Sequence, residues 1–169
     1  MLFRSSFVGD GSFELQRQLV LRLHGGPRLT LDPGKLYARR GRAALEALLD
    51  NTETLLVTEA EWALLGGEAK RHPDWAPPIV LIKRGPLGVR LLTPVRYLDI
   101  PADFEGQPVD TLGAGDVFAA GYIAGLLTGL NLPQAVRLAE HAAAYKLAGA
   151  GRESYPDKKI MERIIARLR

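Results

Sequence analysis

Continuous apolar runs of four or five residues recur in the first 100 positions of this chain. The strongest are TLLVT at 54–58, IVLIK at 79–83 and VRLL at 89–92. Runs of this kind predict strands that are covered on both faces of a sheet. Weaker runs predict further strands: MLFRSSFV at 1–8, RLTLD at 28–32 and VRYLDI at 95–100.

Apolar residues at helical spacing lie between and after these runs. The first helix is predicted over 13–23, with Ser12 as its N-cap and with Leu15, Leu19 and Leu23 on one face. Further helices are expected over 40–49 and 59–65, from about 114, over 133–148, and from near Pro156 with Ile160, Ile164, Ile165 and Leu168 on one face. The alternation of strands and helices predicts one α/β domain over 1–169 with a largely parallel sheet flanked by helices.

Composition narrows the class of protein. The 169 residues, 47% of them hydrophobic and 24% charged, are enough to bury a sizeable core. No apolar run reaches the ~20 residues of a membrane span, and the N-terminal stretch does not have the pattern of a signal peptide. The absence of cysteine excludes disulfides and thiolate metal sites, so a cytoplasmic protein is expected.

The net charge of +3 is mild. The densest basic run is ARRGR at 38–42, where a solvated helix start is favoured over a nucleic-acid patch because no aromatic residues interleave it. A modest positive balance also suits an anionic small molecule such as a nucleotide.

The residues with the clearest chemistry lie in DTLGAGDVFAAG at 110–121. Gly113, Ala114 and Gly115 carry little or no side chain and precede an apolar helix. Because a helix start has unpaired amides and partial positive charge, the N–H groups from Ala114 to Asp116 are expected to cradle a phosphate. Asp116 beside such an anion hole suits a base that takes a proton from an attacking hydroxyl. The alternative is a tight turn at the glycines, with Asp116 as an ordinary capping residue.

This string resembles the C-terminal signature of the ribokinase-like (PfkB) carbohydrate kinases. The resemblance implies a ribokinase-like layered fold and transfer of the ATP γ-phosphate to an alcohol of a sugar or nucleoside. It makes Asp116 the catalytic base and the preceding Gly-Ala-Gly the anion hole. Asp110 and Thr111 match positions that shape a monovalent-cation loop, so K⁺ is implied as an optional cofactor beside ATP and Mg²⁺.

Two earlier segments resemble the family in the same order. In LLVTEAEWALL, Glu61 matches a glutamate that holds hydrated Mg²⁺, and Thr58 stands where asparagine is usual. In IVLIKRGPLG, Gly85 and Gly88 match glycines that lie along the nucleotide, while Lys83 replaces the common threonine. The Lys83 side chain would either reach a phosphate or point to solvent.

LAEHAAAYKLAGAGRESYP resembles the alanine-rich helix that lies beside the adenine. By this resemblance Glu140 and His141 are expected near the nucleotide, and Ser154 lies in a loop that can supply ligands to a monovalent cation. From their spacing, all three histidines, His24, His72 and His141, are expected to be structural or surface residues, and His141 is the exception because it lies near the expected adenine. Trp62 and Trp75 are expected to pack rather than to stack on a ligand.

The resemblance does not extend to the N-terminal part of the family, which supplies the first strands, a lid and a Gly-Gly motif that contacts the sugar. The chain is therefore expected to be the C-terminal, nucleotide-binding portion. Three interpretations stay open: a truncated or split sugar or nucleoside kinase, a nucleotide-binding module without catalysis, and a nucleic-acid-binding protein with a vestigial motif. The first is favoured. It implies a nucleotide and a sugar or nucleoside as partners, self-association or a missing-half partner, and no binding to nucleic acid or membrane.

Overall fold

A computed structural model describes residues 2–4, 10–22 and 28–169 of the chain. The polypeptide divides into two compact units. Unit 1 comprises Met1–Arg84 and Arg90–Leu98, and unit 2 comprises Gly85–Val89 and Asp99–Arg169. The expectation of one domain over 1–169 stays a prediction. No helix in the described ranges has the length and apolar character that a bilayer span requires.

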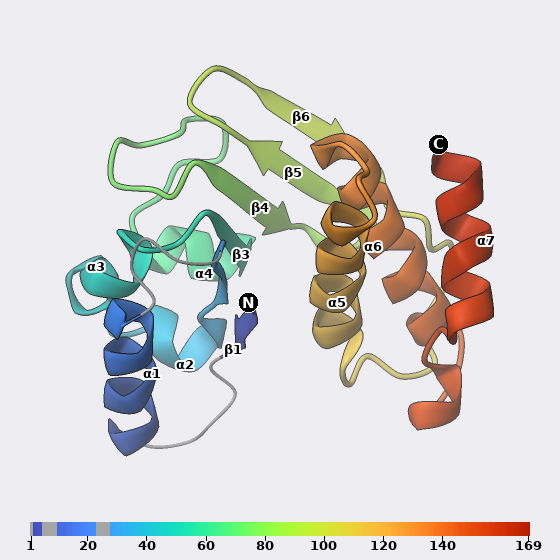
Figure 1. The fold of residues 1–169 in the computed structure, drawn as a ribbon, viewed down its shortest axis with the longest axis horizontal. Coiled ribbons are helices and arrows are strands. Elements are labelled where there is room, and N and C mark those ends of the chain that lie inside the picture. The colour runs from blue at the N-terminus through green and yellow to red at the C-terminus, as the bar shows by residue number, and fades with distance from the viewer. Residues whose placement is uncertain (1, 5–9, 23–27) are drawn as a thin grey trace. The chain divides into compact units, whose positions relative to one another are not determined.

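Six strands form one sheet in the order in which they occur along the chain (Figure 1). The first four are β1 (Leu2–Arg4), β2 (Thr30–Asp32), β3 (Thr54–Thr58) and β4 (Ile79–Lys83), and each pairs with the next in parallel. β5 (Val89–Leu92) and β6 (Tyr97–Ile100) follow after short connections. Because a parallel pair needs a crossover of a dozen or more residues, these last two pairings are antiparallel. The α/β prediction is confirmed, and the sheet is mixed.

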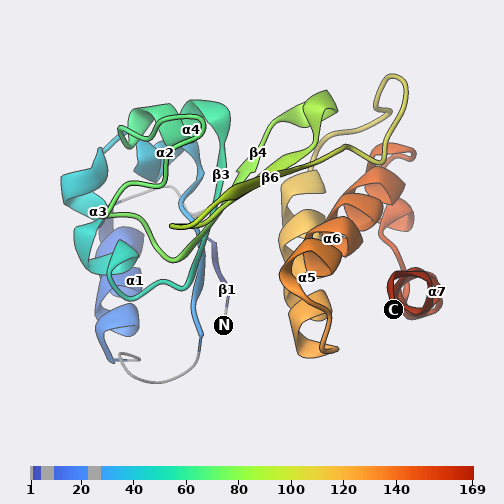
Figure 2. The ribbon, with the colours of Figure 1, turned by 90° about the horizontal axis from the view of Figure 1, so that it is seen from above.

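The helices of unit 1 cover one side of its parallel strands. They are α1 (Asp10–Arg22), α2 (Gly34–Ala38), α3 (Arg42–Leu49) and α4 (Glu59–Leu64), and Figure 2 shows all four on the same side of β2 and β3. Leu55 and Val57 of β3 point into the core beneath these helices, whereas Leu56 between them is equally buried but lies outside that cluster. The continuous apolar strand is therefore covered on both faces, as its sequence predicted.

The first helix differs from its prediction in its start and in its buried face. It begins at Asp10, so Ser12 lies within the first turn and is not the N-cap. Leu15 is 67% exposed, and the buried positions are Phe13 and Val20. The Phe13 ring packs edge-on against Tyr37 of α2 at 4.9 Å between centroids, and this aromatic contact accounts for the different buried face. Leu23, the third residue of the predicted face, lies outside the described residues.

Unit 2 is built on a tightly packed helix pair, α5 (Ala114–Leu127) and α6 (Leu132–Leu147), followed by α7 (Lys158–Leu168). Glycines of α5 allow the close approach, because a Cβ added to Gly125 would lie 2.8 Å from the Cα of Ala135. Asn131 and Gln134 cap the start of α6 reciprocally. The apolar positions predicted for the last helix are half-buried on α7: Ile160, Ile164, Ile165 and Leu168.

Candidate active site

In unit 1 the predicted residues gather at the carboxyl ends of the parallel strands. β2 ends at Asp32, β3 at Thr58 and β4 at Lys83. Ligands of open α/β sheets bind outside this edge. Lys83 Nζ lies 2.9 Å from Asp32 Oδ2, and the two side chains are 18% and 5% exposed. Of the two alternatives left open for Lys83, phosphate or solvent, the structure shows neither, because the side chain is paired with Asp32.

Thr58 and Glu61 form a reciprocal cap at the start of α4. Glu61 N donates to Thr58 Oγ1 at 3.3 Å, and Thr58 N donates to Glu61 Oε2 at 2.7 Å. This is the capping-box arrangement, in which two helix-start amides are satisfied at once. Glu61 is 8% exposed, so its carboxylate is fixed at the strand edge with one oxygen already bonded.

In unit 2 the predicted nucleotide glycines shape the turn between β4 and β5. Gly85 and Gly88 have φ values of +56° and +76°, which side-chain-bearing residues rarely adopt. A Cβ at Gly88 would also lie 2.1 Å from the carbonyl oxygen of Ile100. Gly88 is therefore required both for the conformation and for the close backbone contact.

The Gly-Ala-Gly segment forms a turn that leads directly into α5. Gly113 has φ +79° and ψ −2°, the conformation of the third residue of a type II turn, and the Ala114 N–H donates to the carbonyl of Thr111 at 3.2 Å. The first α-helical bond runs from Val117 N to Gly113 O. The Ala114 amide is thus engaged within the turn, which differs from the expected cradle of three amides. Asp116 lies in the first turn of α5 and is exposed.

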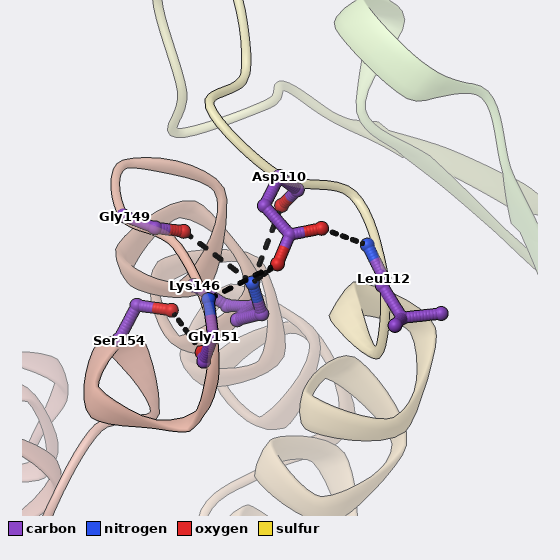
Figure 3. Close-up of polar contacts among 6 residues, drawn as sticks. All are labelled: Asp110, Leu112, Lys146, Gly149, Gly151 and Ser154. Atoms are coloured by element: carbon purple, nitrogen blue, oxygen red, sulfur yellow. Dashed lines mark hydrogen bonds and ion pairs between the residues drawn. The ribbon is translucent and has the colours of Figure 1, made fainter.

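Just before this turn, Asp110 binds a buried lysine that the sequence did not single out (Figure 3). Lys146 Nζ lies 2.8 Å from Asp110 Oδ2, and the Lys146 side chain is 1% exposed. Asp110 also accepts from Leu112 N at 2.9 Å and from Gly151 N at 3.2 Å. The hydrogen bond from Lys146, and then those from the two amides, lower the pKa of Asp110 to about 2.

Ser154 belongs to the same loop region after α6. It is 8% exposed, and its hydroxyl donates to the carbonyl of Gly151 at 2.7 Å. The structure therefore brings the two residues predicted for a cation loop, Asp110 and Ser154, to either side of Gly151. In this predicted cation loop, the positive charge beside the Asp110 carboxylate is the ammonium group of Lys146.

Glu140 and His141 lie on α6 near Asp103. His141 Nδ1 contacts Asp103 Oδ2. Burial raises the pKa of Glu140 to about 7, against a hydrogen bond from the backbone of Asp103, and the Asp103 charge adds to the rise.

Two cavities lie along α6 in unit 2. One of about 430 Å³ adjoins Gly149, Ala150 and Ser154. The other, of about 410 Å³, adjoins His141 and α7, and Tyr145 lines both. Cavities of this size are in the range that holds a small ligand.

The other aromatic and histidine side chains have structural contacts. The rings of Trp62 and Trp75 pack at 5.3 Å between centroids, and Trp62 Nε1 donates to the carbonyl of Glu68. The His72 ring bonds the carbonyl of Pro77 at 2.9 Å. The packing role predicted for the tryptophans and the structural role of His72 are confirmed, and His24 lies outside the described residues.

Lys146 is the site residue that sequence reasoning missed. A signal was present, because Ala139, Ala142 and Lys146 follow one another at i, i+3 and i+7 in an alanine-rich helix and are all buried. A lysine on the apolar stripe of a helix requires a partner, since buried charges are paired. The sequence does not indicate that this partner is Asp110.

The fold is that of a ribokinase-like α/β protein. Residues 33–157, which include every predicted site residue, match the family described as pfkB family carbohydrate kinase. This match extends over well more than half of the sequence, and the chain therefore belongs to the pfkB family.

Curated relatives are similar over most of this chain but are longer. An uncharacterized sugar kinase of Archaeoglobus fulgidus is 33% identical over 165 residues, covering 92% of this chain and 64% of that protein. An ATP-dependent ribose-1-phosphate kinase of Halopiger xanaduensis is 32% identical over 136 residues, covering 78% of this chain and 44% of that protein. The chain thus spans about half to two thirds of the length of these relatives.

Solved structures show the same fold. The nucleoside kinase of Methanocaldococcus jannaschii superposes with a TM-score of 0.81 at 19% identity, covering 98% of this chain and 55% of that one. An uncharacterized sugar kinase of Pyrococcus horikoshii in complex with ATP superposes with a TM-score of 0.75 at 26% identity, covering 94% and 55%.

Proposed function

We propose that this chain is the nucleotide-binding, base-carrying part of an ATP-dependent kinase that phosphorylates an alcohol group of a sugar or nucleoside. The observation that carries the proposal is the glycine turn at Gly113 that leads into α5, with an exposed carboxylate at Asp116 in the first helical turn. Membership of the pfkB family supports it, as do relatives named as sugar and ribose-1-phosphate kinases.

In this proposal the start of α5 acts on both sides of the transferred group. The amides of Gly115 and Asp116 donate to phosphate oxygens, where the helix dipole favours negative charge. The Ala114 amide joins them only by exchanging its bond to Thr111. The Asp116 carboxylate takes the proton of the acceptor hydroxyl. ATP with Mg²⁺, when bound, supplies the phosphoryl group and neutralises its charge.

The remaining predicted residues hold the nucleotide. Gly85 and Gly88 keep the β4–β5 turn open to close approach, and the cavity along α6 that His141 lines suits the base. Glu140 is the neighbouring residue on this helix. Mg²⁺ keeps several waters in most sites. Glu61 fits water-mediated binding, because Oε2 is committed to the cap on Thr58 and Oε1 is the atom that would meet a metal-bound water.

Two further roles concern Lys83 and the acceptor that receives the phosphoryl group. Lys83 reaches a phosphate only by exchanging its bond to Asp32. We expect the acceptor to be positioned by a part that corresponds to the remaining length of the relatives, either on the same polypeptide or on a partner. Phosphoryl transfer depends chiefly on such positioning, so turnover requires that part.

Nucleotide binding tests this proposal on the chain as it exists. Isothermal calorimetry with ADP or ATP and Mg²⁺ is expected to show weak binding, because the chain spans only 44–64% of the length of its relatives and the remaining part would add contacts over the site. Gly113→Ala forces a Cβ onto a residue at φ +79° and to within 2.7 Å of the Tyr155 hydroxyl oxygen, so its nucleotide affinity is expected to fall.

Gly129→Ala is the matched control. Gly129 has φ +81°, follows the other end of α5, and has open space where a Cβ would stand. It therefore carries the same backbone strain away from the turn at Gly113. Equal affinity of the two variants, or no heat and no thermal shift with the unsubstituted chain at millimolar nucleotide, would contradict the proposal.

A further inference from the structure

Lys146 Nζ lies in a cage of oxygen atoms inside unit 2 (Figure 3). Its nearest partner is Asp110 Oδ2 at 2.8 Å, and the carbonyl oxygens of Asp110 and Gly149 are each 3.4 Å away. The ring of Tyr155 lies below it, at 6.0 Å from Nζ to the ring centroid. With the side chain 1% exposed, the ammonium group is enclosed by one carboxylate, two carbonyls and one aromatic face.

This cage joins two loops that are far apart in the sequence. Asp110 precedes the turn at Gly113, and Gly149 follows the end of α6. The same two loops are also tied by Val109 N to Leu147 O at 2.9 Å and by Gly151 N to Asp110 Oδ2 at 3.2 Å. The Lys146 ammonium group therefore lies where the loop that precedes the turn at Gly113 is held against the end of α6.

Tyr155 connects the cage to the anion hole itself. Its ring faces Lys146 Nζ, and its hydroxyl oxygen would be 2.7 Å from a Cβ built on Gly113. Displacement of Lys146 would remove the ion pair to Asp110 and the cation that faces the Tyr155 ring, the two contacts of the lysine that lie beside this turn. The lysine is thus placed to set the position of the amides at the start of α5 without touching a phosphate.

The chemistry of the cage is that of a monovalent-cation site. Carbonyl and carboxylate oxygens are the ligands that replace the hydration shell of K⁺ in proteins. A lysine ammonium carries the same single charge, and it is tethered, so no ion has to be captured from solution and ordered.

We propose that the Lys146 ammonium is the resident cation of this loop pair and a positioning residue for the anion hole, so that the chain neither requires nor binds K⁺ there. The proposal deepens the proposed function, since the hole that Lys146 positions is the one assigned to the nucleotide phosphates. It differs from the optional K⁺ that the sequence resemblance implied at Asp110 and Ser154.

The first test uses the unsubstituted chain in matched KCl, NaCl and choline chloride. Its thermal unfolding midpoint, and its affinity for Mg-ADP where binding is detected, are expected to be the same in all three salts. A midpoint or affinity that rises selectively in KCl would overturn the proposal, because a K⁺ site would then exist beside the lysine. The midpoint decides this point even if the chain binds no nucleotide, so failure of the cation proposal and failure of the proposed function are distinguishable.

The second test empties the cage. Lys146→Ala removes the ammonium and leaves space, and it is expected to lower the unfolding midpoint and to weaken Mg-ADP binding about tenfold in choline chloride, the loss of ~1.4 kcal/mol. Addition of KCl or NH₄Cl is expected to restore both quantities. Lys146→Met fills the same space without charge. Its unfolding midpoint and Mg-ADP affinity are expected to fall as far as those of Lys146→Ala, and KCl or NH₄Cl is not expected to restore them.

Lys158→Ala is the matched control, because Lys158 has a side chain that is 88% exposed on α7. It is expected to behave as the unsubstituted chain in every salt. Restoration of Lys146→Met by KCl, failure of KCl and NH₄Cl to restore Lys146→Ala, or unchanged behaviour of Lys146→Ala would each overturn the proposal. If neither Lys146 variant folds, the salt series on the unsubstituted chain still decides between a resident lysine and a bound ion.

Discussion

At the scale of single residues, Asp116 is the group on which turnover is expected to depend. Asp116→Asn keeps the size of the side chain but cannot take a proton, so kcat is expected to fall about 10²–10⁴-fold while nucleotide affinity changes little. The assay requires a form of the protein that includes the acceptor side. Asp157→Asn is the control, because Asp157 caps α7 through Ile160 N and asparagine caps equally well. Full turnover by Asp116→Asn would exclude it as the base.

Glu140 gives a pH dependence whose sign is fixed by its environment. Its folded-state pKa is raised from 4.5 to about 7, chiefly by burial, so the folded protein holds a proton that the unfolded chain releases. This contribution to stability is fully present below pH 4.5 and is lost as the pH rises toward 7. Glu140→Gln mimics the protonated form and does not titrate. As the pH rises from 4.5 toward 7, the unfolding midpoint of Glu140→Gln should therefore increase relative to that of the unsubstituted chain. A constant difference between the two midpoints, measured by thermal unfolding at several pH values, would contradict the assignment.

At the scale of elements, the stability of unit 2 is expected to depend on the close contact between α5 and α6. A Cβ at Gly125 would lie 2.8 Å from Ala135 Cα and 2.9 Å from its Cβ. Gly125→Val is therefore expected to cost about 1–3 kcal/mol through overpacking. Ala120→Val, at an exposed position of the same helix, controls for the lower helix propensity of valine. Chemical denaturation of both variants measures the difference, and equal losses would show that the two helices can separate without cost.

At the scale of the whole molecule, self-association or association with a partner is expected. Among the described residues, β1 ends the strand order and has β2 as its one partner strand, and the unpaired groups of a sheet edge template further pairing. Light scattering is expected to give a mass above the 18.4 kDa of one chain. A coupled ADP-release assay on sugars and nucleosides is expected to show no ordinary turnover from the chain alone. A monomer with normal kinase turnover would contradict both expectations.

The sequence was most informative where structure is local. The strands at 54–58, 79–83 and 89–92 were predicted with the bounds that the structure has, because a short apolar run reports its own burial. The start of α5 was also predictable from local sequence, because the turn before the helix requires a positive φ and the chain has a glycine there, Gly113. The buried face of the first helix was predicted wrongly, because Tyr37 of another helix determines which side packs.

By itself, the sequence determined the α/β class, the core strands, the family and the residue types at the start of α5. Tertiary structure decided which charged groups meet. Lys83 pairs with Asp32 across 51 positions, and Lys146 with Asp110 across 36. Spacing along one helix or strand reports which residues share a face, but the partner of a charge on another element depends on how the elements pack. Burial makes the pairing of Lys146 with Asp110 important for stability. A lysine side chain that is 1% exposed needs oxygen atoms as partners, and only the folded chain brings these together.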